Sequence, residues 1–245
     1  MKLNGKQYDK FILNGKTYEK FYLNNKIYQS LDPGLILDLP LQNNFTDYSA
    51  SGISMVAGGT SNQPTFALSG RKAGEYCAVF NGSQSIKTTT NLPINSDKVT
   101  IAFWMKTTQA AVAIIAELSA VFDSNNAFAA YTNSPANKIT IADHTGSTFN
   151  RSSGSNTINT SSWIHIAATI DRSLGTNQTK IYINNSLVTV IDIAGDLNGN
   201  FINNILFIGQ RGGNSLGFNG SLTRLKIYNY PFTPSEVSTL YNSEL

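Results

Sequence analysis

The residues from Trp163 to Ile170 alternate between two sets of side chains, and this pattern constrains the fold more than any other. Trp163, His165, Ala167 and Thr169 would lie on one face, and the intervening residues, all Ile or Ala, on the other. Successive side chains of a strand point to opposite faces, so a period of two with β-branched residues predicts a strand rather than a helix.

A hairpin is expected directly after this strand. Residues 180–183 and 187–191 read as two strands, and the dipeptide Asn184-Asn185 separates them. Asparagine tolerates the positive φ that a tight two-residue reversal needs, so this dipeptide indicates a turn. Two further strands are expected over residues 205–208 and 220–228.

The C-terminal end carries the signals of a short helix. Thr233-Pro-Ser-Glu236 is a capping box with Pro at the first helical position. The helix that follows would carry Val237, Leu240 and Tyr241 inward.

Short strands are also expected through the first two thirds of the chain. Residues 35–41 read as the first strand of the main domain, and residues 42–65 read as a loop. The other expected strands are 76–80, 85–88, 99–106, 113–118, 128–131, 138–143 and 148–151. Many short strands with turn signals between them favour an antiparallel two-sheet sandwich over a βαβ fold.

The first thirty residues contain a repeat of ten residues: LNGKQYDKFI, LNGKTYEKFY and LNNKIYQS. Each unit begins with an Asn-Gly or Asn-Asn turn dipeptide, so the repeat predicts a small β-meander. A meander of this size cannot form a core alone and must pack on the main domain, on copies of itself or on a larger assembly. Asp32-Pro33-Gly34 marks a boundary, which divides the chain into residues 1–31 and 32–245.

Composition excludes several classes of function. Residues 1–30 hold six of the 18 basic and two of the 15 acidic residues, so the remaining 12 basic and 13 acidic residues nearly cancel. No basic run on the main domain suggests nucleic-acid binding. No secretory signal peptide and no apolar run of about 20 residues for membrane insertion is visible. Cys77 is the single cysteine and reads as a buried core thiol.

Five motifs in order resemble a known family over residues 35–245. They are Phe80-Asn-Gly82, Phe103-Trp104, Trp163-Ile-His-Ile-Ala167, Tyr182-Ile-Asn-Asn185 and Phe218-Asn-Gly220 with the Tyr-Asn and Thr-Pro-Ser-Glu sequence after it. The set is similar to laminin G-like, concanavalin A-like lectin/glucanase domains. This resemblance implies an all-β, antiparallel jelly-roll sandwich with a short C-terminal helix, used to bind sugars or proteins. It also implies that the first strand of the sandwich, here residues 35–41, pairs with the last, here residues 221–228.

The N-terminal LNGK-x-Y repeats resemble attachment segments of structural proteins from tailed phages of Gram-positive bacteria. That resemblance implies a virion accessory protein, released by lysis, whose residues 1–31 contact other virion proteins or form a homo-oligomer. The alternative interpretation is an extra hairpin layer on a single domain.

Catalysis is not expected. Related glucanases carry a Glu-x-Asp-x-Glu strand that places acids on one face, and this chain has no such run. Glu117 stands alone on its strand. The two histidines do not indicate a Ser-His-Asp site, since His165 matches a structural position of the family motif and His144 lies at a turn.

The resemblance implies a calcium ion in many members, held by an early Asp and an Asp of the last strand. The first position is Asp47 here, which makes Asp47 the candidate metal ligand. The second position is Thr223, so one acid is missing and the calcium site is in doubt.

A sugar site needs amides, a planar aromatic ring and few like charges on a shallow surface. Three loops offer these groups: residues 123–134, 143–151 and 209–217. The candidate carbohydrate-binding residues are Asn126, Tyr131, His144, Arg151, Arg211 and Asn214, whereas Trp104 and Trp163 are expected in the core. The sequence therefore predicts a non-catalytic module that binds surface carbohydrate. The alternatives are a structural, protein-binding decoration module and a degenerate glycosidase.

Overall fold

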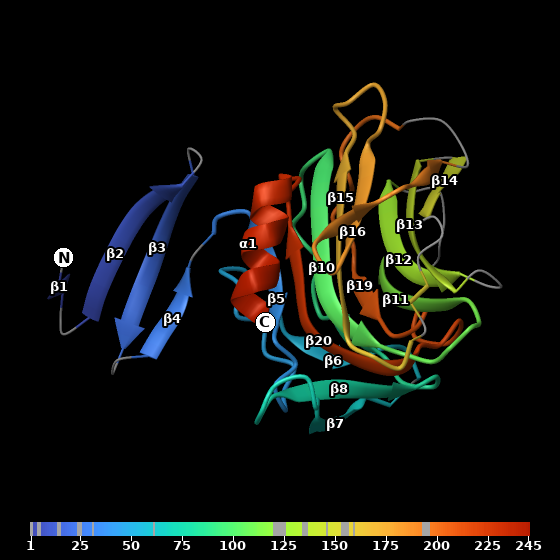
Figure 1. Ribbon diagram of the computed structural model, residues 1–245, viewed down its shortest axis with the longest axis horizontal. Helices are drawn as coiled ribbons and strands as arrows, with labels where there is room; N and C mark the ends of the chain where they lie inside the picture. Colours follow the sequence, from blue (N-terminus) through green and yellow to red (C-terminus); the bar gives the residue numbers. More distant parts are fainter. Residues whose placement is uncertain are drawn as a thin grey trace.

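The computed structural model describes residues 2–3, 6–13, 16–23, 26–30, 32–60, 62–119, 126–133, 137–145, 147–152, 157–158, 160–192 and 197–245 (Figure 1). For residues 2–30, 144–152 and 191–192 only the backbone is described. The described main domain is a sandwich of two antiparallel sheets, which confirms the predicted all-β jelly-roll class.

Sheet I has eight strands, in the order β17-β16-β15-β10-β20-β8-β7, and β5 pairs with β20 beside this path. Its strands are β5 (Leu35–Leu39), β7 (Thr65–Leu68), β8 (Tyr76–Asn81), β10 (Lys98–Lys106), β15 (Ile164–Asp171), β16 (Thr179–Ile183), β17 (Ser186–Val188) and β20 (Asn219–Tyr228). The pairing of β5 with β20 confirms the expected contact of the first and last strands of the domain.

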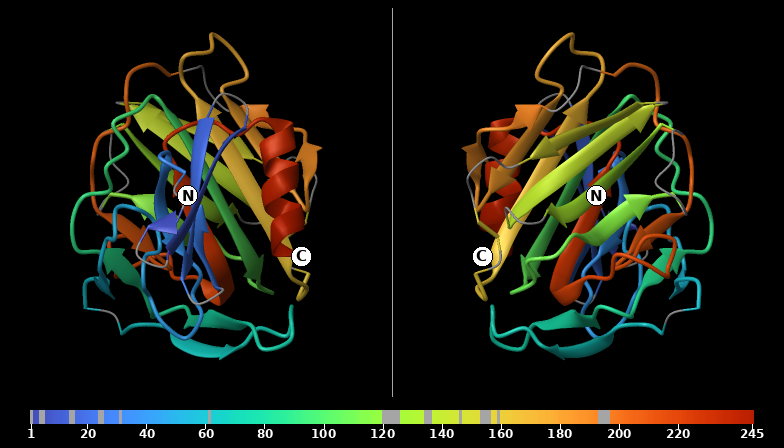
Figure 2. Two further views of the ribbon diagram at one scale, coloured as in Figure 1. Left: turned by 90° about the vertical axis from the view of Figure 1, so that its left-hand side faces the viewer. Right: turned by 90° about the vertical axis from the view of Figure 1, so that its right-hand side faces the viewer.

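Sheet II also has eight strands, in the order β18-β14-β13-β12-β11-β19-β9-β6. They are β6 (Met55–Ala57), β9 (Ile86–Thr88), β11 (Ala113–Leu118), β12 (Ala127–Asn133), β13 (Lys138–Thr145), β14 (Ser147–Ser152), β18 (Ile191–Asp192) and β19 (Leu206–Ile208). The right-hand view of Figure 2 looks onto the outer face of sheet II, and the left-hand view looks from the side of helix α1 (Pro234–Glu244).

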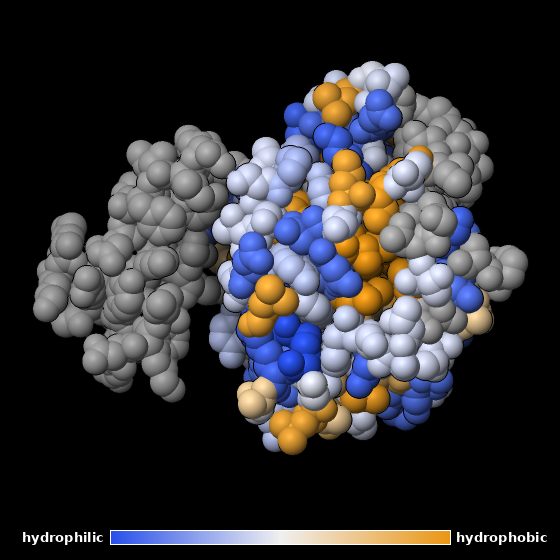
Figure 3. Space-filling model, viewed as in Figure 1, coloured by the Kyte–Doolittle hydropathy of each residue, from blue (hydrophilic) through white to orange (hydrophobic). Residues whose placement is uncertain are grey.

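The main core lies between the sheets and follows the predicted alternation. Ile164, Ile166, Ala168 and Ile170 of β15 belong to it, together with alternate residues of the central strand β10. In the space-filling view, apolar residues gather in the seam between the two sheets, where this core reaches the surface (Figure 3). Cys77 is a buried free thiol, as expected.

The strand predictions failed where strands are short and exposed. β6 and β7 lie within or next to the segment expected to be a loop, and the strand expected over 187–191 is interrupted, giving β17 and β18. β7 is mostly exposed and lies at the edge of sheet I, so its sequence shows no alternation between buried and exposed residues. The predicted turn at Asn184-Asn185 is confirmed, because both residues adopt positive φ (47° and 67°) between β16 and β17.

Helix α1 has the predicted start. Thr233 is the N-cap, and the reciprocal bonds of the capping box join Thr233 and Glu236. The helix packs on the outer face of sheet I, where Val237 is buried with Ala102, Ala167 and Tyr182, and Leu240 packs against this second core. Among the described residues, no helix is long and apolar enough to cross a membrane.

The repeat segment forms a separate antiparallel sheet of four strands: β1 (Lys2–Leu3), β2 (Lys6–Leu13), β3 (Lys16–Leu23) and β4 (Lys26–Ser30). Its register places Asp9 opposite Lys20 and Lys10 opposite Glu19. The predicted turn dipeptides of this segment lie outside the described residues.

A cluster of rings lies beneath the C-terminal half of α1. Trp104 is buried, stacks on Tyr241 with ring centroids 5.6 Å apart, and donates its indole N–H to Glu244 Oε2 at 2.9 Å. His165 lies 5.2 Å from the Trp104 ring and is fully buried, with no hydrogen-bond partner for either ring nitrogen among the described residues. Trp163, by contrast, is only partly buried and donates to the Ser69 carbonyl, which differs from its expected core position.

Burial, assisted by the nearby Arg71 charge, lowers the pKa of His165 from 6.5 to about 4. The unfolded chain therefore takes up a proton below pH 6.5 that the folded protein resists until about pH 4, and stability falls as the pH falls through this window. The loss attributable to His165 is about 3 kcal/mol when complete.

The variant His165→Phe should remove this part of the acid sensitivity. Urea denaturation at a series of pH values from 7 to 4 should show a shallower loss of unfolding free energy than in the wild type. Glu244 and Arg71 face the same cluster and stay in both proteins, so their contributions largely cancel in the comparison. The control is Tyr48→Phe, a change at an exposed ring outside this cluster, which should keep the wild-type slope. Equal slopes for His165→Phe and wild type would contradict the assignment.

Candidate functional site

The outer face of sheet II carries a row of side chains that are aligned across neighbouring strands. The register runs from Val56 in β6 through Lys87, Phe207, Glu117 and Ala129 to Ala142 in β13. Glu117 lies on the outer face because its neighbours Ala116 and Leu118 both belong to the core between the sheets. Lys87 Nζ lies 5.7 Å from the centroid of the Phe207 ring.

Tyr131 lies in an adjacent row of the same face. It pairs with Ile114 in β11 and Thr140 in β13, whereas the neighbouring Ala130 and Ile141 face the core. Burial raises the pKa of the Tyr131 phenol, although the Arg211 charge and a hydrogen bond with Thr140 oppose the shift. The phenol is therefore neutral at physiological pH, and its ring is partly exposed.

Arg211 joins this face from the loop after β19. Its Nε donates to Glu117 Oε2 at 3.0 Å; the Glu117 side chain is 0% exposed and that of Arg211 is 29% exposed. The loop is closed by an Arg211–Ser215 backbone bond of 2.9 Å. Gly213 adopts a φ of 76° and lies close to Gly58. A Cβ added to Gly213 would come within 2.4 Å of the Gly58 carbonyl carbon, so a larger residue cannot be accommodated without movement.

The structure brings together three of the six predicted carbohydrate-binding residues. Tyr131 and Arg211 lie on the outer face of sheet II, and Asn214 is exposed in the Arg211 loop, where its N–H donates to the Arg211 carbonyl. Asn126 lies at the other end of β12, about 16 Å from Tyr131 at ~3.3 Å per residue. Its carbonyl accepts a hydrogen bond from Ile202, and it does not contribute to the Tyr131 and Arg211 group.

His144 and Arg151 are described only in their backbone. His144 pairs with Thr148 and Arg151 pairs with Ile141, in the β13–β14 hairpin. Their side chains lie outside the described residues.

Sequence reasoning missed Glu117 and Lys87 as members of this face. The isolated position of Glu117 in the sequence argues against catalysis but does not indicate its contact with Arg211, which spans 94 residues. The available signal was the alternation of β11, which places Glu117 opposite the core face.

The acidic side chains described on the strands of sheet II do not form a catalytic pair. Glu117 points outward to Arg211, whereas Asp143 is fully buried and bound to Arg172 within the sandwich. Glycoside hydrolysis uses two carboxyl groups that flank one bond, at about 5–10 Å from each other on a common surface. These two carboxylates lie on opposite faces of the sheet and cannot serve that chemistry.

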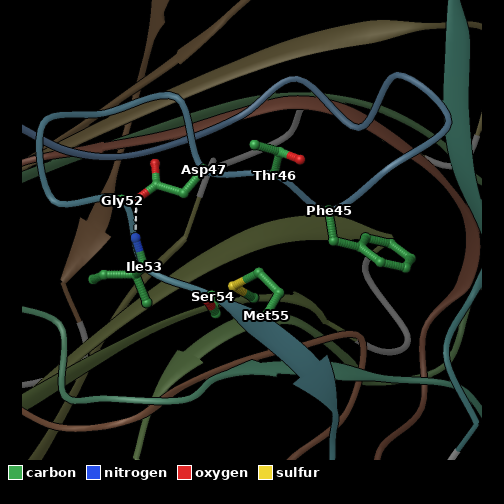
Figure 4. Close-up of a pocket in the computed structure, with 7 residues that line it drawn as sticks. All are labelled: Phe45, Thr46, Asp47, Gly52, Ile53, Ser54 and Met55. Carbon is green, nitrogen blue, oxygen red and sulfur yellow. Dashed lines mark hydrogen bonds between the residues drawn. The ribbon is translucent and has the colours of Figure 1, made fainter.

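A separate pocket of about 340 Å³ lies in the connection between β5 and β6. Its lining residues are Phe45, Thr46, Asp47, Gly52, Ile53, Ser54 and Met55 (Figure 4). Asp47 closes this loop: Oδ1 accepts from the N–H groups of Asp38 and Ser49, and Oδ2 accepts from the Ser49 hydroxyl and the Ile53 N–H. The four distances lie between 2.8 and 2.9 Å.

These bonds do not fit the calcium site that the resemblance implied. Both Asp47 oxygens are occupied by donors of its own loop, and Thr223 offers a neutral hydroxyl that itself donates to the Pro40 carbonyl at 2.9 Å. In the part of the chain that the structure describes, no group of three or more His, Cys, Asp or Glu side chains is arranged to hold a metal ion.

Comparison with known proteins identifies the family. A family model described as the concanavalin A-like lectin/glucanases superfamily matches residues 80–238. A comparison with curated protein sequences finds no match.

Solved structures share the fold at low sequence identity. One is domain 4 of AbnA, a GH43 extracellular arabinanase from Geobacillus stearothermophilus, in complex with arabinotriose (TM-score 0.66, 19% identity, 84% of this chain and 98% of that chain). Another is the binding domain of botulinum neurotoxin DC, in complex with rat synaptotagmin II (0.63, 15%, 88% and 53%) or with SialylT (0.65, 16%, 88% and 53%). This chain spans about half the length of those toxin chains.

The Glu117–Arg211 pair should make Arg211 important for stability as well as for the shape of the face. Arg211→Met would leave a buried carboxylate without its guanidinium, at a cost of about 1–3 kcal/mol. The double variant Glu117→Gln/Arg211→Met should recover part of this loss, because the buried charge that lost its guanidinium is removed as well. Urea denaturation of both single variants and the double variant gives the coupling energy; strictly additive losses would contradict a direct interaction.

Proposed function

Because this chain belongs to the concanavalin A-like lectin/glucanases superfamily, we propose that it is a non-catalytic carbohydrate-binding module that binds sugars on the outer face of sheet II. The observation that carries this proposal is the arrangement of Tyr131 and Arg211. A neutral, partly exposed ring lies beside a guanidinium whose position is fixed by a buried carboxylate.

This arrangement suits sugar binding for two reasons. An aromatic ring offers a flat apolar surface with a polar tip, and a guanidinium offers several hydrogen-bond donors in a fixed plane. Because Glu117 and the loop hold the Arg211 guanidinium before a ligand arrives, less conformational entropy is lost on binding. The arabinanase domain in complex with arabinotriose and the toxin domain in complex with SialylT support a saccharide as the class of ligand.

The repeat segment completes the proposal. Residues 1–31 attach the module to a larger particle, and the protein acts as a phage virion accessory protein that contacts host surface glycans. The support is the repeat itself: among the strands that the structure describes, its sheet shares no hydrogen-bonded strand with either sheet of the sandwich. If many copies are displayed on one particle, binding of one copy raises the effective concentration of the others near the surface. Many weak sites can then give tight overall binding.

Replacing Tyr131 tests the binding face. Tyr131→Ala should weaken binding to any glycan that the wild-type protein captures on a glycan array by about tenfold or more, ~1.4 kcal/mol. Tyr131→Phe keeps the ring and should retain most of the affinity.

The control is Tyr48→Ala, which removes a tyrosine that is 42% exposed in the loop between β5 and β6. Titration calorimetry with the best array ligand quantifies each variant. Equal losses for Tyr131→Ala and Tyr48→Ala, or no loss for Tyr131→Ala, would contradict the proposed face.

Deleting residues 1–31 tests the attachment role. The shortened chain should keep the thermal unfolding midpoint of the sandwich and its glycan binding, but lose self-association or incorporation into particles. Light scattering and co-sedimentation measure these properties. If the deletion leaves assembly unchanged, the segment has no such role; if no glycan binds while assembly persists, a structural decoration module that binds protein is the better interpretation.

A further inference from the structure

Two strands share one edge of β20, and a gap separates them. β5 pairs with residues 225–228 of β20, and β8 pairs with residues 219–222. Thr223 and Arg224 lie at the gap, and Arg224 adopts a positive φ of 54° there. At this point the carbonyl of Pro40, just after β5, accepts the Arg224 N–H of β20, and Tyr76, the first residue of β8, has no partner in the strand register of β20.

The side chain of Gln42 fills this gap. Its Nε2 lies 2.8 Å from the Tyr76 carbonyl, 3.2 Å from the Pro40 carbonyl and 3.2 Å from Thr223 Oγ1. Its Oε1 accepts the Tyr76 N–H at 2.9 Å, so the carboxamide pairs with both backbone groups of Tyr76 as a strand residue would. Three oxygens from three separate segments thus surround one nitrogen.

Thr223, which is fully buried, contacts the same two carbonyls through its hydroxyl. Its hydroxyl lies 2.9 Å from the Pro40 carbonyl and 3.3 Å from the Tyr76 carbonyl, and the Pro40 carbonyl also accepts the Arg224 N–H at 3.2 Å. Glu75, the acidic residue next to Tyr76, does not serve this cluster, because Arg71 and Arg224 bind its carboxylate.

Convergent oxygens of this kind are what a hard cation seeks, but calcium takes six to eight oxygens at about 2.3–2.6 Å and favours carboxylates. All three oxygens here belong to neutral groups, and an N–H donor already occupies the space between them. A donor and a cation satisfy the same carbonyls in alternative ways, so the two cannot be present together.

We propose that the Gln42 carboxamide takes the place of a metal ion at the junction of β5, β8 and β20, and that the domain is therefore stable without calcium. Gln42 and Thr223 together determine this property. The proposal concerns the scaffold, so it stands or falls separately from the glycan-binding face.

Thermal unfolding of the full chain in excess EDTA and in millimolar calcium chloride tests the proposal. The wild-type midpoint should be the same in both. Gln42→Glu replaces the NH₂ group by a negatively charged oxygen that faces three other oxygens, so its midpoint should fall by several degrees in EDTA and rise again with calcium.

Two further variants keep the test decisive. Gln42→Ala should lower the midpoint equally with and without calcium, because the junction loses its donor and gains no ligand. Gln42→Glu/Thr223→Asp should respond to calcium more strongly than Gln42→Glu, whereas Gln42→Glu/Thr223→Asn should not exceed it.

Calcium binding to each variant is measured by titration calorimetry. The proposal is overturned if calcium raises, or EDTA lowers, the wild-type midpoint, or if Gln42→Ala is as stable as the wild type. If Gln42→Glu fails to fold, the comparison of wild type with Gln42→Ala still decides the question.

Discussion

Sheet I is covered on both faces, by sheet II on one side and by α1 on the other, and the strands at its centre are apolar in both directions. In β10, residues such as Ile101 and Phe103 fill the space between the sheets, while Ala102 and Trp104 lie beneath the helix. Burial of apolar area is the dominant favourable term in folding, and β10 contributes to it on both sides. The outer face of sheet II is covered less completely: Phe207, Ala129 and Ala142 are buried there, whereas Tyr131, Arg211 and Lys87 are partly exposed.

Most of the fold could be predicted because its signals are local. The period of two in β15, the Asn184-Asn185 turn and the capping box at Thr233 each report on a few adjacent residues, and all three are present. The short edge strands were missed for the opposite reason. β7 is too exposed to alternate, so its sequence holds little information about its partner.

The candidate site was only partly predictable, because its contacts join distant positions. Arg211, Asn214 and Asn126 are equally good candidates in the sequence, because each places an amide or guanidinium group in a loop. Only the register of β11 and β12 shows that Asn126 lies away from the others. Likewise Thr223 was recognised as a missing acid, whereas its partner Gln42 lies 181 residues away and had no distinguishing signal. Sequence shows which groups are available, and topology decides which of them meet.

The aligned row on sheet II also sets a length scale. From Val56 to Ala142 it crosses six strands, and with about 4.8 Å between neighbouring strands it extends ~24 Å. A molecule lying along this row would run perpendicular to the strands, but it would meet exposed side chains only near β6 and β9, because Phe207, Glu117, Ala129 and Ala142 are 0–4% exposed. Most of the row is therefore a buried support, and the partly exposed groups of this face lie beside it, at Tyr131 and Arg211.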